Sequence, residues 1–448
     1  MHTVGLISSK YSFPPRMEKY MLYLFSKRVI MKKILILGAN GFIGHHIVQQ
    51  LKDKYHITIA TRESKDNGLN SIYCDFSKDF EVALWEKRVK GFDVVINAVG
   101  IIGENGKNSF ENLHYKTPIA IFKASQNQKV KRIIQISALG VKEGATTQYY
   151  QSKLKADNFL KELSIEYMIL KPSIVYGEGG KSTILFKALA NLPIIPIIES
   201  GEQRLQPVFI DDLTQLVDKT IEMTTVNQEI AVVGKESITY QEMLFKFRTY
   251  LGKKPTITVK MPNFLAIFGK FFGEEAISKE SITMLKEENF ANKDDTVRIL
   301  KREPKSMDEV IFNHQAPIAE KLYSQLYFLR FALRLIIAFV WIWSGVVSAF
   351  LYPQNLALEL LNDVGINGVL AVPTLYFASF LDITIGLFIA LNYQAKNLAY
   401  LSLIVIMVYT LILTILAPHH WLHPFGCVLK NLPLLALIYI YTLLERYR

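Results

Sequence analysis

Cysteine is scarce in this 448-residue chain, which contains two. Cys74 and Cys427 lie in different regions, and their spacing suits neither a disulfide framework nor a zinc site. This scarcity excludes a disulfide-stapled secreted scaffold and favours a reducing compartment for the soluble part of the chain. Internal repeats and low-complexity segments are also missing from residues 31–315.

A cluster of arginine and aromatic residues of the kind that binds nucleic acid is likewise missing. The formal net charge is nevertheless +11, from 51 Lys and Arg against 40 Asp and Glu. We therefore expect no nucleic-acid partner. Basic residues that flank membrane helices on the cytoplasmic side explain part of the excess.

Charged residues are sparse after residue 329, where long apolar runs dominate. A helix crosses a hydrocarbon core of about 30 Å with about 20 residues. Four segments meet this length, two of them uncharged and two with a single charge each. They are Leu335–Tyr352, Val372–Leu391, Asn397–Ala417 and Phe425–Leu444. The sequence therefore predicts an all-α bundle of four transmembrane helices in residues 329–444, and the lipid bilayer as a partner.

Basic residues mark one side of these four spans. The flanking and inner-loop positions are Arg330, Arg334, Lys396, Arg446 and Arg448. The opposite loops contain Glu359 and Asp363 but no Lys or Arg. This is a positive-inside pattern, so we predict a multi-pass protein of the plasma or inner membrane with both termini and the soluble domain cytoplasmic.

Two ionisable residues lie inside the predicted spans, Asp382 in the second and Lys430 in the fourth. Such groups are costly in hydrocarbon and usually face the bundle interior. We hypothesise that they pair there; a proton or quinone role for Asp382 and snorkelling of Lys430 are the alternatives. In the loop before the fourth span, His419, His420 and His423 have the usual polarity of a membrane interface, and we predict no metal site.

Three glycines lie close together directly after the apolar run Lys33–Leu37. This run predicts a buried parallel strand, and Gly38, Gly41 and Gly44 follow it at a spacing of three. In a dinucleotide-binding turn the first glycine allows the tight turn, and the second lets backbone N–H groups approach a pyrophosphate. The third lets the helix pack on the strand. The sequence therefore predicts nucleotide binding at this loop.

Strands and helices alternate after this loop, which predicts a Rossmann-type, doubly wound parallel α/β sheet. From about Gly177 the alternation becomes irregular, and residues 177–315 predict a smaller, α-rich substrate lobe over the carboxyl ends of the strands. Segments expected to be strands are Lys33–Leu37, His56–Thr61, Asp93–Ala98, Arg132–Ser137, Tyr167–Leu170, Leu205–Ile210 and Ile230–Val233; those expected to be helices are Ile43–Leu51 and Tyr149–Leu163.

Three polar residues form the candidate catalytic set. Ser137 ends a predicted strand, and Tyr149 and Lys153 lie four apart on one face of the next helix. A tyrosine with a pKa of about 10 is a poor acid or base at pH 7, but a neighbouring ammonium favours its phenolate. A serine hydroxyl can hold the substrate oxygen. The set therefore predicts proton transfer next to the nucleotide.

Residues 31–315 resemble an extended, atypical short-chain dehydrogenase/reductase, close to the subgroup that contains the nucleotide-binding accessory subunit of mitochondrial complex I. The residues that carry the resemblance are the Gly38–Gly44 loop, Asn97–Gly100, Ser137, Tyr149, Lys153, Lys171–Gly177 and Gln206–Asp212. The resemblance implies an active enzyme, because the tyrosine and the lysine are both kept.

The same resemblance implies which residues hold the cofactor. Asp75 and Phe76 would contact adenine, Asn97 and Ala98 would lie along the cofactor, and the Pro172 segment would line the nicotinamide pocket. The full cofactor set is Gly38, Asn40, Gly41, Phe42, Ile43, Gly44, Arg62, Asp75, Phe76, Asn97, Ala98, Lys153 and Pro172.

The choice between NADP and NAD depends on the end of the second strand, Thr61-Arg62-Glu63. An arginine there accommodates the 2′-phosphate of NADP, whereas an acidic residue binds the ribose hydroxyl of NAD. Arg62 comes first, so we predict NADP, with NAD as the alternative because of Glu63.

Residues 329–444 resemble DoxX-like four-helix membrane domains through Trp341–Gly345 and Lys430–Pro433. Residues 1–30 fit neither domain, so we expect a disordered tail or an over-extended start before Met31. The oligomeric state is left open.

The predicted function is that of a membrane-anchored NAD(P)-dependent oxidoreductase at the cytoplasmic face. Its small-molecule substrate would be lipophilic, such as a quinone precursor or a lipid, and residues 137, 149 and 153 would carry the chemistry. A non-catalytic NAD(P)H-binding structural or assembly protein, and a nucleotide-sugar epimerase or dehydratase, are the alternatives.

Overall fold

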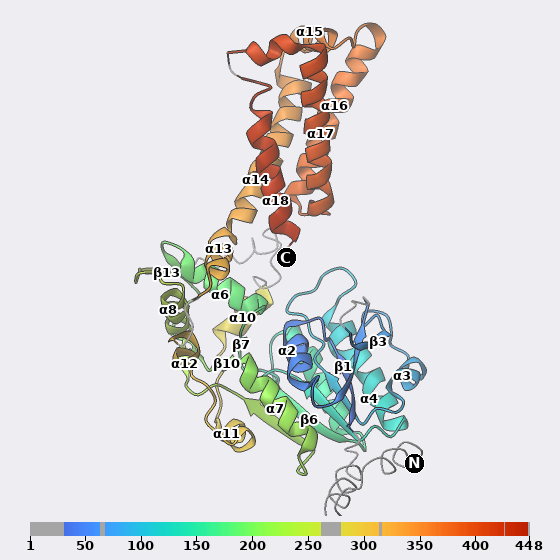
Figure 1. The fold of residues 1–448 in the computed structure, drawn as a ribbon, viewed down its shortest axis with the longest axis vertical. Helices are drawn as coiled ribbons and strands as arrows, with labels where there is room; N and C mark the ends of the chain where they lie inside the picture. The colour runs from blue at the N-terminus through green and yellow to red at the C-terminus, as the bar shows by residue number, and fades with distance from the viewer. Residues whose placement is uncertain (1–30, 63–67, 261–278, 313–315, 425, 447–448) are drawn as a thin grey trace, which may run out of the picture.

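The computed structural model describes residues 31–62, 68–260, 279–312, 316–424 and 426–446. An α/β part is joined to a bundle of long helices that extends away from it (Figure 1). The predicted disordered tail, residues 1–30, lies outside the described residues, as does Glu63.

A seven-stranded sheet with the strand order β11-β6-β5-β4-β1-β2-β3 forms the centre of the α/β part. Every neighbouring pair in it is parallel. Its strands are β1 (Lys33–Leu37), β2 (His56–Thr61), β3 (Asn70–Tyr73), β4 (Val94–Asn97), β5 (Arg132–Ile136), β6 (Glu166–Pro172) and β11 (Gln228–Val232). The predicted parallel α/β sheet is confirmed.

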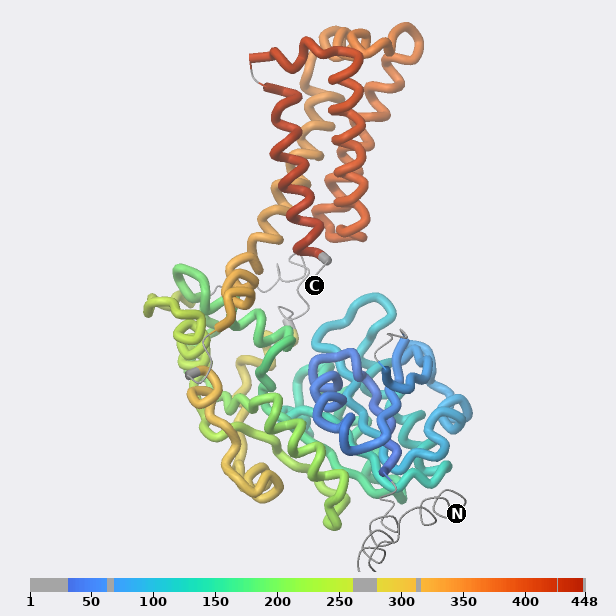
Figure 2. The backbone as a smooth tube through the Cα atoms, viewed as in Figure 1, coloured from blue at the N-terminus to red at the C-terminus, as the bar shows by residue number. Residues whose placement is uncertain are grey.

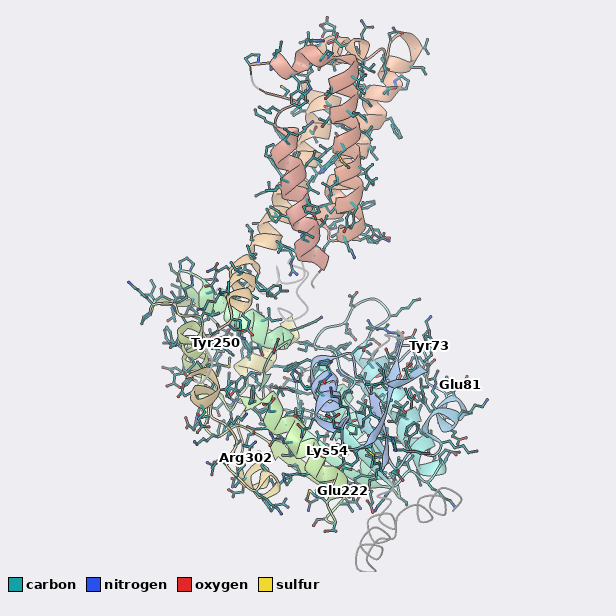
Figure 3. All side chains as sticks on the ribbon, viewed as in Figure 1. Lys54, Tyr73, Glu81, Glu222, Tyr250 and Arg302 are labelled. Atoms are coloured by element: carbon teal, nitrogen blue, oxygen red, sulfur yellow. The ribbon has the colours of Figure 1, made fainter. Side chains whose placement is uncertain are left out.

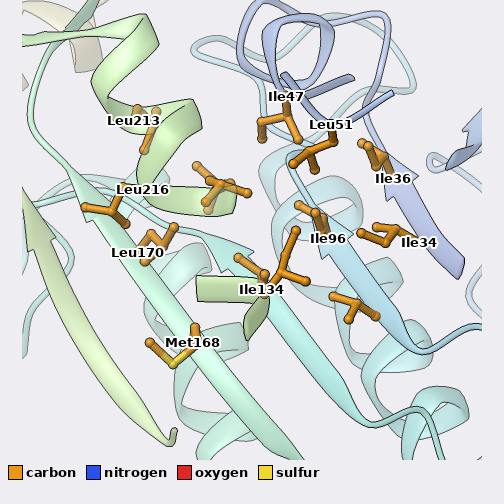
Figure 4. Close-up of a cluster of buried hydrophobic side chains, with 14 of the residues drawn as sticks. Ile34, Ile36, Ile47, Leu51, Ile96, Ile134, Met168, Leu170, Leu213 and Leu216 are labelled. Atoms are coloured by element: carbon orange, nitrogen blue, oxygen red, sulfur yellow. The ribbon is translucent and has the colours of Figure 1, made fainter. Parts of the chain in front are cut away.

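Both faces of the central strands β1, β4 and β5 are buried, which explains why these strands are mostly apolar. Ile34 and Ile36 of β1 point into a core under α2 (Phe42–Leu51) and α7 (Ile210–Glu222), part of which Figure 4 shows. Leu35 and Leu37 point to the opposite core. That core lies under α3 (Val82–Val89), α4 (Thr117–Asn127) and α5 (Gln148–Lys161). The predicted doubly wound arrangement is therefore confirmed.

A second lobe packs around its own apolar core, formed by residues such as Tyr176, Phe186, Tyr240 and Phe247. Its helices are α6 (Lys181–Asn191), α8 (Tyr240–Tyr250), α10 (Lys279–Lys286) and α12 (Met307–Phe312). Its short strands pair as β7 (Val175–Tyr176) with β10 (Val208–Phe209), β8 (Ile195–Ile197) with β13 (Thr258–Lys260), and β9 (Arg204–Leu205) with β12 (Ile238–Thr239).

Part of the segment expected to form this lobe returns to the main sheet. β11 extends the sheet beside β6, and α7 and α11 (Asp294–Leu300) pack on the face covered by α2. The boundary at residue 177 stays a prediction.

The apolar C-terminal third forms a four-helix bundle. Its helices are α14 (Leu329–Val346), α16 (Ala371–Ala390), α17 (Ala395–Leu416) and α18 (Asn431–Arg446). α14 and α16 approach closely at Gly345, where an added Cβ would lie 2.4 Å from the Ser379 carbonyl oxygen. Three helices of the described chain are long and apolar enough to cross a membrane, whereas α18 is shorter than the predicted fourth span. Its crossing stays a prediction.

The first membrane helix is attached to the second lobe. α13 (Ile318–Leu326) precedes α14, and the two-residue connection keeps right-handed helical angles, so together they form an almost unbroken helix. Glu320 of α13 accepts a hydrogen bond of 2.6 Å from Lys187 of α6. The Lys187 amine also lies 4.8 Å from the ring centre of Tyr250, which Figure 3 labels at this end of the lobe.

Candidate functional site

The glycine loop has the geometry that its sequence predicts. Gly38 has a φ of +78°, and a Cβ there would lie 2.8 Å from the carbonyl oxygen of Ala98. A Cβ on Gly44 would lie 2.1 Å from the carbonyl oxygen of Gly38. No other residue fits either position without moving the backbone, because both contacts are with main-chain atoms. The first turn of α2 is therefore held directly against the end of β1.

The N-terminus of α2 suits an anionic ligand. Gly41 is its N-cap, and no side chain of the described residues caps the helix there. The helix has no acidic residue in its first turn, so its N–H groups and its dipole can both favour a pyrophosphate. Next to it, the Asn40 amide donates a 2.8 Å hydrogen bond to the Thr61 hydroxyl at the end of β2. The loop thus fits a dinucleotide.

Phe42 and Ile43 serve the packing behind this loop. The Phe42 ring lies against the turn after β7, since Cβ atoms added at Gly177 and Gly180 would contact it at 3.5 and 3.1 Å. Ile43 is partly buried against the core under α2 and α7. Both residues position the helix that carries the N–H groups.

Asn97 and Ala98 lie beside the glycine loop at the end of β4. The Asn97 amide donates to Gln135 Oε1 at 2.8 Å, and its oxygen accepts the Val99 N–H at 3.2 Å. The Ala98 N–H donates to the Leu37 carbonyl at 3.0 Å. These two hydrogen bonds fix the Asn97 side chain at the edge of the site.

Residues after β2 and β3 line the expected adenine side. Arg62 is exposed directly after β2. Burial would raise the pKa of Asp75, but hydrogen bonds from the Ser77 hydroxyl and N–H and the charge of Arg62 outweigh it and lower the pKa. The Phe76 ring stacks on Trp85 with centres 6.0 Å apart. Both side chains are thus fixed at the rim.

Lys153 and Tyr149 lie near each other at the expected nicotinamide side of the site. Lys153 is buried on α5, and its amine donates a 3.1 Å hydrogen bond to the Ile136 carbonyl at the end of β5. The same amine lies 5.7 Å from the Tyr149 ring centre. Pro172 is buried at the end of β6, two strands from β4. The structure thus brings the predicted tyrosine and lysine together at the carboxyl edge.

Ser137 is turned toward a residue that the sequence analysis missed. Its hydroxyl donates a short hydrogen bond to Asp157 Oδ2, and Asp157 is fully buried on α5. Asp157 follows Lys153 by four residues, so Tyr149, Lys153 and Asp157 share one helix face. That spacing is the signal that could have revealed it. The Oδ1 atom has no hydrogen-bond partner in the described part of the chain.

A buried histidine is the second residue that the sequence analysis missed. His114 Nε2 accepts the Ile101 N–H at 3.1 Å, which leaves the proton on Nδ1 to donate to the Ser152 hydroxyl at 3.1 Å. Its ring packs edge-on against Tyr149 with centres 5.1 Å apart. Burial and the charge of Lys153 lower its pKa well below the usual range, so it stays neutral.

The low-polarity surroundings shift the three residues on α5 in different directions. Burial lowers the pKa of Lys153 to about 8, and the Asp157 carboxylate opposes this shift. Burial raises the pKa of Asp157 to about 6, opposed by the Ser137 hydrogen bond and by Lys153. Burial, with Tyr150 and Asp157, raises the pKa of Tyr149 above its ordinary value. Tyr149 is therefore a neutral phenol at pH 7 and can donate a proton. The expected shift toward the phenolate is wrong for this structure, because burial dominates the pKa of Tyr149.

The second lobe covers the start of α5. Glu280 of α10 accepts backbone hydrogen bonds from Gln148 and Tyr149, and burial raises its pKa despite them. Met284 packs into the small apolar cluster that contains Tyr149. The site thus lies between the sheet and this lobe.

The buried carboxylate of the bundle has other partners than the one hypothesised. Asp382 is 9% exposed and forms side-chain hydrogen bonds with Tyr409 of α17 and Ser344 of α14. Lys430 is exposed instead. The hypothesised pairing of Asp382 with Lys430 is wrong, because Lys430 precedes α18 in the loop and does not face the bundle interior.

Two family models match the chain. A family described as NAD(P)H-binding matches residues 38–189, and a DoxX-like family matches residues 338–439. The first range contains the glycine loop and the residues on α5, and the second contains most of the bundle.

Known relatives cover the α/β part. A ceramide reductase of Caulobacter vibrioides is 22% identical over 243 residues, 51% of this chain and 74% of that protein. The mitochondrial NADH dehydrogenase (ubiquinone) 1 alpha subcomplex subunit 9 of Mus musculus is 25% identical over 256 residues, 53% of this chain and 66% of that protein. The crystal structure of ADP-L-glycero-D-manno-heptose-6-epimerase from Helicobacter pylori superposes with a TM-score of 0.50 at 17% identity, over 64% of this chain and 95% of that one. The last likeness shows the fold alone.

Proposed function

We propose that this chain, which joins an NAD(P)-binding Rossmann domain of the short-chain dehydrogenase/reductase type to a DoxX-like membrane domain, is a reductase of a lipophilic carbonyl compound. One observation carries the proposal. The amine of the buried Lys153 lies 5.7 Å from the ring centre of the neutral Tyr149, at the edge of the sheet that carries the glycine loop. Ser137 is the third residue of the candidate catalytic set, and its hydroxyl donates a hydrogen bond to Asp157.

The proposed step is a carbonyl reduction. When bound, the dinucleotide supplies a hydride to the carbonyl carbon. Tyr149 gives its proton to the carbonyl oxygen, so a C–H and an O–H bond form as the C=O double bond becomes single. Lys153 stabilises the resulting phenolate electrostatically, and the proton is regained from solvent.

The nucleotide we propose is NADP(H). Arg62 follows β2 directly, and Thr61 before it accepts the hydrogen bond of Asn40 in the glycine loop. A ribose on this loop would therefore lie near the guanidinium, which suits a 2′-phosphate.

The architecture supports a substrate that enters from the membrane. In Figure 2 the chain enters β1 at the end of the sheet far from the bundle, so the carboxyl ends of the parallel strands point toward the bundle. The near-continuous α13–α14 helix links the second lobe to the bilayer. We place this domain on the cytoplasmic face, since the basic residues favour that side.

A second candidate is a non-catalytic nucleotide-binding or assembly protein. Two hydrogen bonds favour it, because they engage side chains that a substrate would need. The Ser137 hydroxyl donates to Asp157, and the Lys153 amine donates to the Ile136 carbonyl. The similarity to the complex I subunit also supports it. Substitution of Tyr149 separates the two candidates.

The test compares Tyr149→Phe with Tyr150→Phe in the full chain, purified in mild detergent. NADPH and NADH oxidation are followed against quinones and keto-lipids, the latter chosen because one relative is named a ceramide reductase. Loss of the proton donor should lower kcat by about 10²- to 10⁴-fold without weakening nucleotide binding. The Tyr150 ring packs at Gly140 and against Tyr149, and its hydroxyl is hydrogen-bonded to Asn289, so the Phe variant keeps the ring contacts and should keep turnover within about threefold.

Two results would favour the assembly role. One is tight NADPH binding with no turnover of any substrate in the panel. The other is turnover that Tyr149→Phe leaves unchanged. A preference for NADH over NADPH would overturn the proposed nucleotide alone.

A further inference from the structure

The loops at the end of the bundle far from the α/β part (Figure 1) carry three side chains of types that can bind a metal ion. Asp363 is the last residue of α15 (Gln354–Asp363), between α14 and α16. His419 and His420 lie in the 3₁₀ turn η6 (Pro418–Leu422), between α17 and α18. The fold thus brings together ligands from two loops that are 57 residues apart.

The three side chains point their ligand atoms at one another. His420 Nε2 lies 3.2 Å and His419 Nε2 3.4 Å from the same oxygen, Asp363 Oδ2. One ligand atom from each residue falls within 4.8 Å of the other two. The side chains of Asp363, His420 and His419 are 38%, 16% and 64% exposed, so the group is sheltered at His420 and open to solvent at His419.

The two distances from Asp363 Oδ2 are compatible with tetrahedral coordination. A tetrahedral zinc ion with bonds of about 2.0–2.1 Å separates its ligand atoms by about 3.3 Å. Right-angled neighbours in an octahedral site with the same bond lengths would be about 2.9 Å apart. The distances of 3.4 and 3.2 Å from Asp363 Oδ2 are close to the first value, and without a metal the shorter one is a hydrogen bond between His420 and Asp363. Two imidazoles and one carboxylate are ligands that zinc accepts, with a fourth position left for water.

We propose that Asp363, His419 and His420 form a binding site for a divalent transition metal, with zinc as the preferred ion. The site is independent of the proposed reductase, since it lies at the opposite end of the membrane helices. A bound ion would tie the loop before α16 to the loop before α18, and thereby fix the outer ends of the bundle.

The three loop histidines alone suggested interfacial polarity, because loops at membrane interfaces often collect His and Trp. The structure adds the Asp363 carboxylate to His419 and His420 and does not place His423 in this group. His423 Nδ1 lies 3.5 Å from Cys427 Sγ. His423→Gln is therefore a matched control in the same loop.

The experiment uses the full chain without a histidine tag, purified in detergent and stripped with a chelator. Zinc binding is measured by competition with a chromogenic chelator and by elemental analysis after desalting. Cobalt substitution reports the geometry through its visible absorption. Variants are Asp363→Asn, His419→Gln, His420→Gln and the control His423→Gln.

We expect one zinc per chain, a tetrahedral cobalt spectrum, and zinc that raises the thermal midpoint of the wild type. Each of the three variants should weaken zinc binding at least about tenfold, and the control should stay within about threefold. Binding should also weaken in acid, because the imidazoles must be unprotonated. Substoichiometric zinc, or equal loss in His423→Gln, would overturn the site. A thermal midpoint that depends on pH but not on zinc would show a simple histidine–aspartate ion pair instead.

Discussion

At the scale of single residues, the proposed chemistry depends on a row of three side chains on α5. Tyr149, Lys153 and Asp157 are spaced four apart, and burial shifts the pKa of each. The Asp157 carboxylate keeps part of the charge on Lys153 that burial would remove. It also holds the Ser137 hydroxyl. Asp157 is thus a positioning residue that supports the two others.

Replacing this carboxylate should stabilise the domain in a pH-dependent way. The pKa of Asp157 rises from 3.8 to about 6 on folding, so the folded state binds its proton more tightly than the unfolded state. The contribution of this raised pKa to the free energy of unfolding is fully present below pH 3.8 and is lost as the pH rises through about 6. At neutral pH the ionised group therefore costs about 3 kcal/mol.

Asp157→Asn removes this cost while keeping the shape. Its thermal midpoint, relative to wild type, should rise between about pH 4 and pH 8, with most of the rise below about pH 6 and a plateau above it. Differential scanning fluorimetry in one detergent measures both proteins across this range. A difference that does not change with pH would show that Asp157 is not buried as an acid of raised pKa.

At the scale of elements, the contact between α2 and β1 makes the nucleotide site. The helix begins at its glycine N-cap, and Gly44 in its first turn lies on the carbonyl of Gly38. A helix held this close to the strand end has its N–H groups in one fixed place. Packing, rather than a capping side chain, sets their position.

Gly44→Ala should therefore damage both fold and binding. The added methyl group would lie 2.1 Å from a main-chain oxygen, so α2 must shift, at a cost of about 1–3 kcal/mol or more. We expect a lower thermal midpoint and loss of NADPH binding, measured by fluorimetry and nucleotide titration. Gly41→Ala is the control, since its methyl group would lie 3.2 Å from the same oxygen. It should weaken binding with a smaller change in stability; equal losses of stability would contradict this account.

Elements with a strong local pattern were predictable from the sequence. β1 and β2 have the predicted bounds: β1 is an apolar run followed by Gly38, and β2 is rich in β-branched residues that favour a strand. The position of β11 at the sheet edge was not predictable, since its partner β6 lies about 60 residues earlier in the chain.

The candidate site was predictable where its residues follow a local spacing. The glycine loop and the pair Tyr149 and Lys153 do so. His114 has no such signal, because only the fold places it against Tyr149. Likewise, the contact of Asp363 with two histidines depends on how the membrane helices pack.

At the scale of the whole molecule, the bundle and the α/β part are connected by one helix and by ionic contacts. α13 is tied to α6 through Lys187 and Glu320, and it continues into α14. The exposed α13 residues Ile318 and Leu322 add apolar surface at this junction. The proposed uptake of a lipophilic substrate from the bilayer would use this connection.

Turnover should then depend on the concentration of substrate within the membrane. In vesicles, adding about ten parts of inert lipid at a fixed total amount of lipophilic substrate should lower a subsaturated rate about tenfold, because the substrate stays in the lipid. Spectrophotometric NADPH oxidation measures the rate. A short-chain, water-soluble analogue is the control and should be unaffected. A rate that follows the bulk concentration for both substrates would contradict the proposal.

The near-continuous helix Ile318–Leu351 also fixes the distance between the second lobe and the membrane. Its 34 residues span about 50 Å, whereas a hydrocarbon core takes up about 30 Å. The remaining length determines how far the second lobe stands from the lipid headgroups. A thicker bilayer would draw more of this helix into the hydrocarbon and bring the reaction site closer to the headgroups. Bilayer thickness, which differs between membranes, is therefore a variable that can set how easily the substrate reaches Tyr149.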